Sequence, residues 1–199
     1  MSTLWDTRYN TTQFIYGKEP NGFFAAELHK LTPGNLLLPG EGEGRNAVYA
    51  ASEGWKVHAF DQSSIGSEKA LNFAREVGVK INYQICSADE FQPEEAHYDA
   101  VGLTFFHADP ITRKMIHSKV NQALKPAGIV ILEAFHTSQI GKDTGGPQSI
   151  QMLLDEKTLK TDFAGLEVIL LEELTVNLNE GPFHQGKAQV IRYLGKKKA

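Results

Sequence analysis

The residues of this chain that point most directly to chemistry lie in the segment 36–46. Three glycines, Gly40, Gly42 and Gly44, stand at alternate positions after an apolar run that ends at Pro39. A glycine leaves no Cβ between the backbone and a ligand. The helix pattern that follows would aim its free N–H groups at the same point, which suits a phosphate or a carboxylate. We therefore expect a strand, a glycine turn and a helix that bind a nucleotide, with an ordinary glycine-closed turn as the alternative.

The spacing of these glycines separates two classes of cofactor. A dinucleotide site has the pattern G-x-G-x-x-G, which would place the third glycine at position 45. That position is occupied by Arg45, and the chain reads G-x-G-x-G instead. The spacing therefore favours S-adenosylmethionine over NAD or FAD.

Acidic residues follow the next two expected strands. Asp61-Gln62 ends the second strand, about 20 residues after the turn, where an acid accepts hydrogen bonds from ribose hydroxyls. A helix cap is the other reading of Asp61. Asp89 ends the third strand and is expected to accept the amine of adenine beside the Ala88 backbone, with a plain turn residue as the alternative.

Two aromatic residues follow Thr104 at the end of the fourth expected strand. Phe105 and Phe106 are expected to pack against the methionyl arm or the sulfonium, because an aromatic face favours a cation. A core role is the alternative for one of the two.

The elements that must position these residues alternate regularly along the chain. Apolar runs predict five strands, at 36–38, 56–61, 81–86, 98–106 and 128–135. Helices are predicted at 63–77, with Ser63 or Ser64 as its cap and Gly78 at its end, and at 110–124, with a turn at 125–128. Strands that alternate with helices imply an α/β fold with a mainly parallel sheet covered on both faces.

The C-terminal third departs from this alternation. A helix is expected at 150–163, followed by strands at 167–178 and 187–194 with only the residues 179–186 between them. A parallel crossover needs about a dozen residues or more. The sheet should therefore end in an antiparallel strand.

The first residues of the chain show no clear helix or strand pattern but are rich in aromatic side chains. A disordered leader would be poor in them. We expect the segment 1–30 to dock on the domain as a lid that covers a site. The six aromatic residues of its first 24 positions are Trp5, Tyr9, Phe14, Tyr16, Phe23 and Phe24.

Composition bounds the remaining possibilities. The 199 residues suit a single domain, 1–199, and the formal net charge of −4 gives no reason to expect nucleic acid as a partner. Cys86 is the sole cysteine, which excludes an intrachain disulfide and suggests a buried thiol. No metal-binding histidine spacing, signal peptide or membrane span is apparent, so we expect no metal, no membrane and a cytoplasmic location.

Four short motifs give the chain a family resemblance. They are W-D-x-R-Y at 5–9, Y-G-x-x-P-N at 16–21, G-x-G-R-N at 42–46 and L-K-P-x-G at 124–128. Together they resemble the class I S-adenosylmethionine-dependent methyltransferases, in the branch of the TehB-type and thiopurine methyltransferases. The resemblance covers nearly the whole chain. It implies a three-layer Rossmann-like fold with a seven-stranded sheet, mainly parallel with an antiparallel C-terminal strand, and S-adenosyl-L-methionine as cofactor.

The resemblance also implies which residues contact the cofactor. They are Tyr16, Gly40, Glu41, Gly42, Gly44, Arg45, Asn46, Asp61, Gln62, Ala88, Asp89, Thr104 and Phe105.

One position departs from the family pattern. The usual motif has an acid two residues before the first glycine, where this chain has Leu38. The acid helps to hold the methionyl amine, so that contact must come from elsewhere. Glu41 is the nearest substitute, although a side chain inside the turn can face solvent.

The expected reaction is methyl transfer to a small molecule, with a thiol or a chalcogen oxyanion as the suggested acceptor. Such soft nucleophiles need little general-base help, and no catalytic base stands out. The chain lacks the N/D-P-P-Y/F motif of amino-methyltransferases after the fourth strand. Acceptor contacts are expected from His107, Arg113, Glu133, His136, Glu180 and His184, of which the last two resemble an E-G-x-x-H-x-G element of relatives.

Two other functions stay open at this point. A non-catalytic domain that binds S-adenosylmethionine or a nucleotide would fit the missing acid at Leu38. An NAD(P)-dependent oxidoreductase would fit the fold but not Arg45. The oligomeric state is expected to be a monomer or a homodimer.

Overall fold

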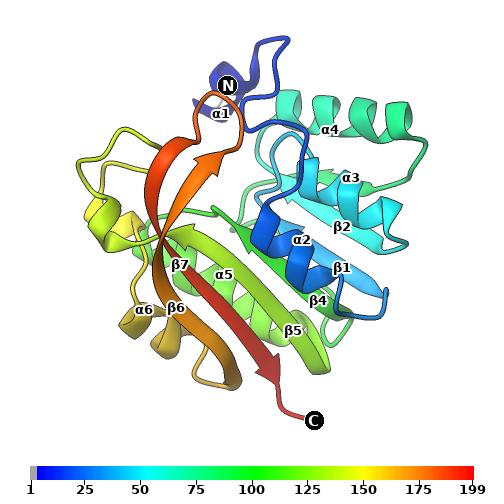
Figure 1. The fold of residues 1–199 in the computed structure, drawn as a ribbon. Helices are drawn as coiled ribbons and strands as arrows, with labels where there is room; N and C mark the ends of the chain where they lie inside the picture. The colour runs from blue at the N-terminus through cyan, green and yellow to red at the C-terminus, as the bar shows by residue number, and fades with distance from the viewer. Residues whose placement is uncertain (1–3) are drawn as a thin grey trace.

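The computed structural model describes residues 4–199 and is organised around one sheet with helices on both faces (Figure 1). The sheet has seven strands in the order β3-β2-β1-β4-β5-β7-β6, and β7 alone runs against its neighbours. The expected Rossmann-like methyltransferase topology is therefore confirmed. The strands are β1 (Asn35–Pro39), β2 (Lys56–Asp61), β3 (Asn82–Ile85), β4 (Tyr98–Thr104), β5 (Leu124–Phe135), β6 (Leu166–Asn179) and β7 (Gln185–Lys197).

The strand order reverses between β1 and β4, which lie side by side. In an open parallel sheet, ligands bind beyond the carboxyl ends of the strands at this switch point. The glycine turn follows β1 and the segment Thr104–His107 follows β4, so both lie at that edge.

The helices begin and end much as their local sequence predicts. Ser63 caps α4 and accepts a hydrogen bond from Gly66 N. Asp109 caps α5 and accepts from the N–H groups of Ile111 and Thr112, while Pro110 is the first residue of the helix. Gly78 ends α4 with a φ of 82°. The α-helices are α1 (Leu4–Tyr9), α2 (Gly22–Leu28), α3 (Arg45–Ser52), α4 (Ser64–Val77), α5 (Pro110–Ala123) and α6 (Glu156–Asp162), and the 3₁₀ turns are η1 (Thr137–Gln139) and η2 (Ile150–Met152).

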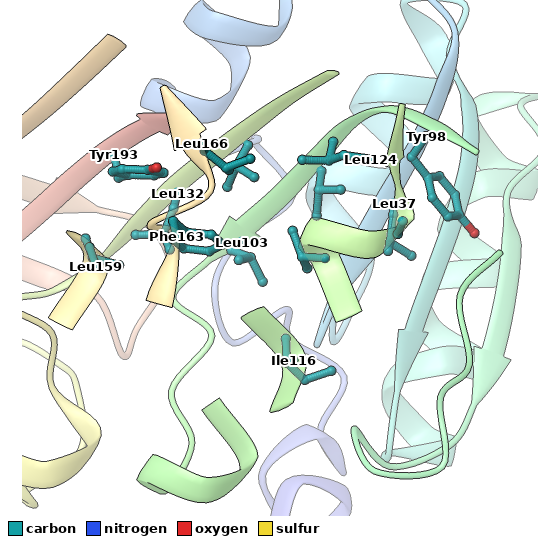
Figure 2. Close-up of a cluster of buried hydrophobic side chains, with 14 of the residues drawn as sticks. Leu37, Tyr98, Leu103, Ile116, Leu124, Leu132, Leu159, Phe163, Leu166 and Tyr193 are labelled. Atoms are coloured by element: carbon teal, nitrogen blue, oxygen red, sulfur yellow. The ribbon is translucent and has the colours of Figure 1, made fainter. Parts of the chain in front are cut away.

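The core lies on both faces of the sheet. One cluster joins the sheet to α5 and α6, and Figure 2 shows part of it, including Ile116 of α5 and Leu159 of α6. A second cluster joins the other face to α2 and α3. Cys86 is 9% exposed in the first cluster, and burial raises the pKa of its thiol, which confirms the expected buried cysteine.

Three expectations about secondary structure were wrong in detail. The N-terminal segment holds two helices, α1 and α2, where no element was predicted. The helix expected at 150–163 is interrupted, because Leu154 pairs with the end of β5 and Asp155 then caps α6. The predicted turn at 125–128 lies inside β5 as an irregularity, with Ala127 at a φ of 64°.

The structure explains why position 38 is apolar. Leu38 is 1% exposed and belongs to the cluster that α2 covers with Phe24. A Cβ added at Gly102 of β4 would lie 2.6 Å from atoms of both Leu38 and Phe24, so the three residues are tightly packed. The side chain at this position therefore faces a helix rather than a ligand.

This packing predicts that an acid cannot be restored at position 38. Leu38→Asp should lower the free energy of unfolding by at least about 3 kcal/mol, because it buries a charge without a partner. Leu38→Met, which conserves volume, should cost less than about 1.5 kcal/mol. Urea denaturation of both variants checks this, and a Leu38→Asp variant as stable as Leu38→Met would contradict the packing argument.

Candidate functional site

A cavity of about 580 Å³ lies at the switch point between β1 and β4. Its lining comes from the N-terminal segment, the glycine turn, the ends of β4 and β5, the loop 142–148 and the β6–β7 hairpin. The residues that face it are Leu4, Trp5, Arg8, Tyr16, Gly40, Glu41, Arg45, Asn46, Thr104, Phe105, His107, Phe135, Lys142, Asp143, Gly145, Gly146, Pro147, Gln148, Met152, Pro182, Phe183, His184 and Gln185.

Seven of the thirteen expected cofactor residues therefore meet at one cavity. They are Tyr16, Gly40, Glu41, Arg45, Asn46, Thr104 and Phe105. They come from the two strand ends at the switch point, from the start of α3 and from the N-terminal segment.

Glu41 faces this cavity from within the glycine turn. Its backbone N–H donates to Phe60 O at 3.1 Å, and its carboxylate Oε1 accepts from Ala47 N at 2.8 Å near the start of α3. Burial raises the pKa of Glu41 to about 7, against the opposing effect of the Ala47 N–H and the Arg45 charge. The residue is half-buried and lines the cavity, and its carboxylate is bonded to the start of α3 rather than free in solvent.

The other expected cofactor residues lie outside the cavity. Gly42 and Gly44 are buried in the turn, and Asp61 is buried with its two carboxylate oxygens accepting from Gly42 N and Ser63 N at 3.1 and 2.8 Å. Burial raises the pKa of Asp61, and these backbone bonds oppose the shift. Gln62 and Asp89 are exposed and Ala88 is half-buried, away from the cavity lining.

The N-terminal helix explains why Asp61 is covered. Tyr9 of α1 is buried, and a Cβ on Gly42 would lie 2.5 Å from its hydroxyl oxygen, so only glycine leaves room for the ring. Asp6 accepts from Ser63 Oγ at 2.7 Å, beside the start of α4. In this conformation α1 closes the region around Asp61.

A lysine clamp holds the segment that follows α1. Lys69 of α4 donates to Thr11 O at 3.0 Å and to Gln13 O at 2.7 Å, and it pairs with the buried Glu43. Glu43 in turn accepts from Ile15 N at 2.7 Å. A charge-assisted bond of this kind is about twice as strong as a neutral one.

Asn21 fastens the lid at its other end. Its amide Nδ2 donates to Glu133 Oε1 at 2.6 Å and to Glu180 Oε1 at 3.0 Å, while its Oδ1 accepts from Phe24 N as the cap of α2. Its backbone N–H donates to Asn46 Oδ1 at 2.9 Å. One buried side chain thus connects the lid to β5 and to the β6–β7 hairpin.

Arg45, which lines the cavity, forms an ion pair with Glu180 behind it. Arg45 Nη2 lies 2.9 Å from Glu180 Oε2, and Nη1 donates to Tyr16 O at 3.1 Å. Burial alone would raise the pKa of Glu180, but the bond to His184 and the charge of Arg45 lower it overall.

His184 stands beside this ion pair inside a box of aromatic rings. Its Nδ1 lies 3.5 Å from Glu180 Oε2, and its ring centroid lies 4.5 to 5.2 Å from those of Tyr16, Phe105 and Phe135. No partner for Nε2 is found among residues 4–199. Burial lowers the pKa of His184, so its ring is neutral near pH 7 and can accept a proton from a molecule in the cavity.

His107 also faces the cavity, but its ring is fully engaged. Phe135 N donates to Nε2 at 3.2 Å, which leaves Nδ1 as the donor to Met152 O at 2.8 Å. Burial lowers the pKa of His107 to about 4. The residue therefore links β4 to the end of β5 and has no free nitrogen for an acceptor.

The four other candidates for acceptor contacts lie outside the cavity. Arg113 pairs with Asp162 at 2.9 Å between α5 and α6. Glu133 uses its two oxygens for Asn21 and Arg192, and His136 caps η1. Glu180 is not part of the lining either, although it supports Arg45 and His184, which are.

Sequence reasoning missed several residues that line the cavity, above all Arg8, Trp5 and Phe183. Two of them stand in the W-D-x-R-Y motif, whose chemistry was not considered. Lys142 and the glycines of the loop 145–146 also line it. The Gly-Gly-Pro run at 145–147 marks a loop but does not indicate which part of the molecule the loop covers.

The fold is that of S-adenosylmethionine-dependent methyltransferases of known structure. Residues 37–128 match a family described as a methyltransferase domain. This confirms the enzyme class and makes S-adenosylmethionine the cofactor that the domain and the fold imply. No curated protein matches the chain.

Solved structures of low sequence identity share the fold. A structure from work on the conversion of a disulfide bond into a thioacetal group during echinomycin biosynthesis has a TM-score of 0.78 at 15% identity, covering 98% of this chain and 91% of its own. TehB from Haemophilus influenzae has a TM-score of 0.74 at 18% identity, and the match covers 98% of this chain but 66% of TehB. A S-adenosylmethionine-dependent methyltransferase from Methanosarcina mazei has a TM-score of 0.72 at 18% identity, over 90% of this chain and 99% of its own.

Among residues 4–199, no helix is both long enough and apolar enough to cross a membrane.

The lysine clamp leads to a prediction about the lid. Lys69→Met should speed hydrogen exchange in residues 9–15 by about tenfold or more, because it removes the bonds to their carbonyls and leaves Glu43 buried without a cation. Exchange in β1 and β4 should change little. Lys160→Met, at an exposed pair with Glu156, is the control. Equal protection of residues 9–15 in both variants would contradict the clamp.

Proposed function

We propose that this chain transfers a methyl group from S-adenosylmethionine to a small molecule, with a thiol or a chalcogen oxyanion as acceptor. The observation that carries the proposal is the shared cavity at the switch point. It brings the glycine turn and the end of β4 together under the N-terminal lid with His184, for whose Nε2 no partner is found among residues 4–199. The TehB-like branch and a cytoplasmic location stay predictions of the sequence.

The residues present fit the methionyl half of the cofactor. Glu41 lines the cavity and supplies a carboxylate three residues after the position where the family pattern has its acid. A group whose pKa burial raises to about 7 gains most from a nearby cation, since the ammonium replaces lost hydration. Glu41 is thus our candidate for holding the methionyl amine, and Phe105 is our candidate for packing against the sulfonium.

The adenosine half fits if α1 moves. Asp61 has the carboxylate that ribose hydroxyls require, but Tyr9 packs over Gly42 and Asp6 over Ser63. We infer that the lid opens to admit the cofactor and closes over it. Lids of this kind exclude water and move on microsecond to millisecond timescales.

When bound, the cofactor supplies an electrophilic methyl group for an in-line displacement. The chain's own residues align the acceptor and exclude water, which is the main work in such a reaction. His184 Nε2 is placed to accept the proton of a thiol, while Glu180 holds the ring through Nδ1. No further side chain is needed for a soft nucleophile.

A small acceptor is favoured by the enclosure of the site. The lid, the loop 142–148 and the hairpin tip surround a cavity of about 580 Å³, which suits a small molecule rather than a folded protein. The structure from the work on echinomycin biosynthesis concerns the conversion of a disulfide bond into a thioacetal group, which is chemistry at sulfur.

Calorimetry with S-adenosylmethionine and S-adenosylhomocysteine tests the proposal, together with release of S-adenosylhomocysteine in the presence of thiols, selenite and tellurite. Failure to bind either cofactor form at millimolar concentration would overturn it. Cofactor binding with no transfer to any acceptor would favour the non-catalytic binding domain. NADH binding would favour the oxidoreductase.

The pKa of Glu41 predicts a pH dependence of cofactor binding. The ammonium binds the carboxylate form, so affinity should fall as the pH drops below about 7, by about tenfold between pH 8 and pH 6. Glu41→Gln should bind weakly at both pH values and show no such trend. It should also unfold at a higher temperature without cofactor at pH 8, because the folded state no longer buries a carboxylate. Calorimetry at both pH values and thermal unfolding check the two effects.

The position of His184 predicts a defect that high pH repairs. With a thiol acceptor, His184→Asn should lower kcat/KM at pH 7 by about 10- to 100-fold, since a base contributes on that order or more. The defect should shrink near pH 9, where the thiol ionises unaided. His29→Asn, at an exposed histidine, is the control. A defect of the same size at both pH values would show a packing role instead.

A further inference from the structure

Arg8 of α1 extends along the cavity between two aromatic rings. Its Cζ lies 4.8 Å from the centre of the Trp5 ring and 5.4 Å from that of Phe183. Nη1 donates to the hydroxyl of Tyr16 at 3.1 Å. Figure 1 shows α1 beside the tip of the β6–β7 hairpin that carries Phe183, so the guanidinium bridges the lid and the hairpin.

Among residues 4–199 this guanidinium has no acidic partner. Arg45, Arg113 and Arg192 each pair with a carboxylate there, whereas Arg8 and the exposed Arg75 do not. The bond from Arg8 to Tyr16 uses one of five N–H donors. The chain as a whole carries a net charge of −4, so an unpaired cation that lines the cavity is not a consequence of a basic surface.

Both ring centres lie close enough to Arg8 Cζ for cation–π contacts, which hold the guanidinium at the cavity. The N–H groups in the plane of a guanidinium suit the two oxygens of a carboxylate. Lys142 lines the same cavity without an ion pair among the described residues and adds a second positive charge. Asp143 also lines the cavity, but it is exposed.

We propose that Arg8 binds a carboxylate or equivalent oxyanion of the methyl acceptor, so that the acceptor is a small anion with a flat or apolar body. The body would lie against the aromatic walls formed by Trp5, Phe183 and Phe135. This inference rests on the proposed methyltransferase function, and it adds the charge and the shape of the acceptor.

The cofactor also carries a carboxylate, on its methionyl group, so the same chemistry has a second source. The position of Arg8 favours the acceptor. Its two ring partners, Trp5 and Phe183, belong to the lid and the hairpin tip, and Phe183 is 50% exposed, whereas Glu41 and the glycine turn lie at the end of β1. The experiment separates the two sources.

The test uses the full chain loaded with S-adenosylhomocysteine and two matched pairs of thiols. The pairs are 2-mercaptobenzoate with thiophenol, and 3-mercaptopropionate with 1-propanethiol. We expect the wild type to bind the charged member of each pair more tightly, and Arg8→Gln to lose that preference by about 10- to 100-fold while Kd for S-adenosylhomocysteine stays the same. Arg8→Lys should keep part of the preference, and Arg75→Gln on α4 should keep all of it.

Each other outcome decides against the assignment. Wild type that binds S-adenosylhomocysteine could bind the charged and neutral thiols equally, or bind neither. Either result would overturn the proposal that the acceptor is an anion and leave the methyltransferase proposal standing. If Arg8→Gln weakens S-adenosylhomocysteine but not its decarboxylated analogue, the carboxylate is that of the cofactor and the acceptor assignment is wrong. If wild type does not bind S-adenosylhomocysteine at all, the proposed function fails and this inference falls with it.

Discussion

The ion pair between Arg45 and Glu180 is the interaction on which the rest of the site depends. A cation at the first turn of a helix is unfavourable, because the positive end of the helix dipole lies there. Arg45 is nevertheless the first residue of α3, and its charge is offset by Glu180 at 2.9 Å. Because Arg45 is buried, removing Glu180, whose side chain is 15% exposed, would leave a buried charge without its partner, which typically costs about 3–5 kcal/mol. The pair therefore ties the glycine turn of the first half of the chain to the hairpin of the last.

The same ion pair accounts for the closed shape of the lid. Glu180 also accepts from Asn21, and Arg45 donates to Tyr16 O, so both ends of the segment 16–21 are bonded to it. At the hairpin tip, a Cβ on Gly181 would lie 2.6 Å from Gly17 N, and the residue has a φ of 73°, which glycine adopts at little cost. The E-G-x-x-H element is thus explained by three separate demands: a carboxylate for Arg45, a close backbone approach, and a histidine that faces the cavity.

The sequence predicted the parts of the molecule that depend on local patterns. Apolar runs and caps placed the strands and α4 and α5 within a few residues, because burial on both faces of a parallel sheet leaves a continuous apolar signal. The short N-terminal helices were missed, since α1 and α2 are stabilised by contacts with distant residues such as Ser63 and Glu133 rather than by their own pattern. The roles of Arg113 and Glu133 were equally inaccessible, because both side chains are paired with residues far along the chain.

Position 38 is a leucine and position 41 a glutamate, and the N-terminal segment gives a structural reason for both. Once α2 covers the end of β1 with Phe24, position 38 must be apolar, and the nearest carboxylate that can reach the cavity is that of Glu41. That carboxylate costs free energy in the empty protein, since burial raises its pKa to about 7. A cation bound beside it would recover part of this cost, which is the physical basis of the proposed contact between Glu41 and the methionyl ammonium. The lid helix α2, the apolar core around Leu38 and the glycine turn are packed together, so a substitution in α2 should alter the position of the turn and of Glu41.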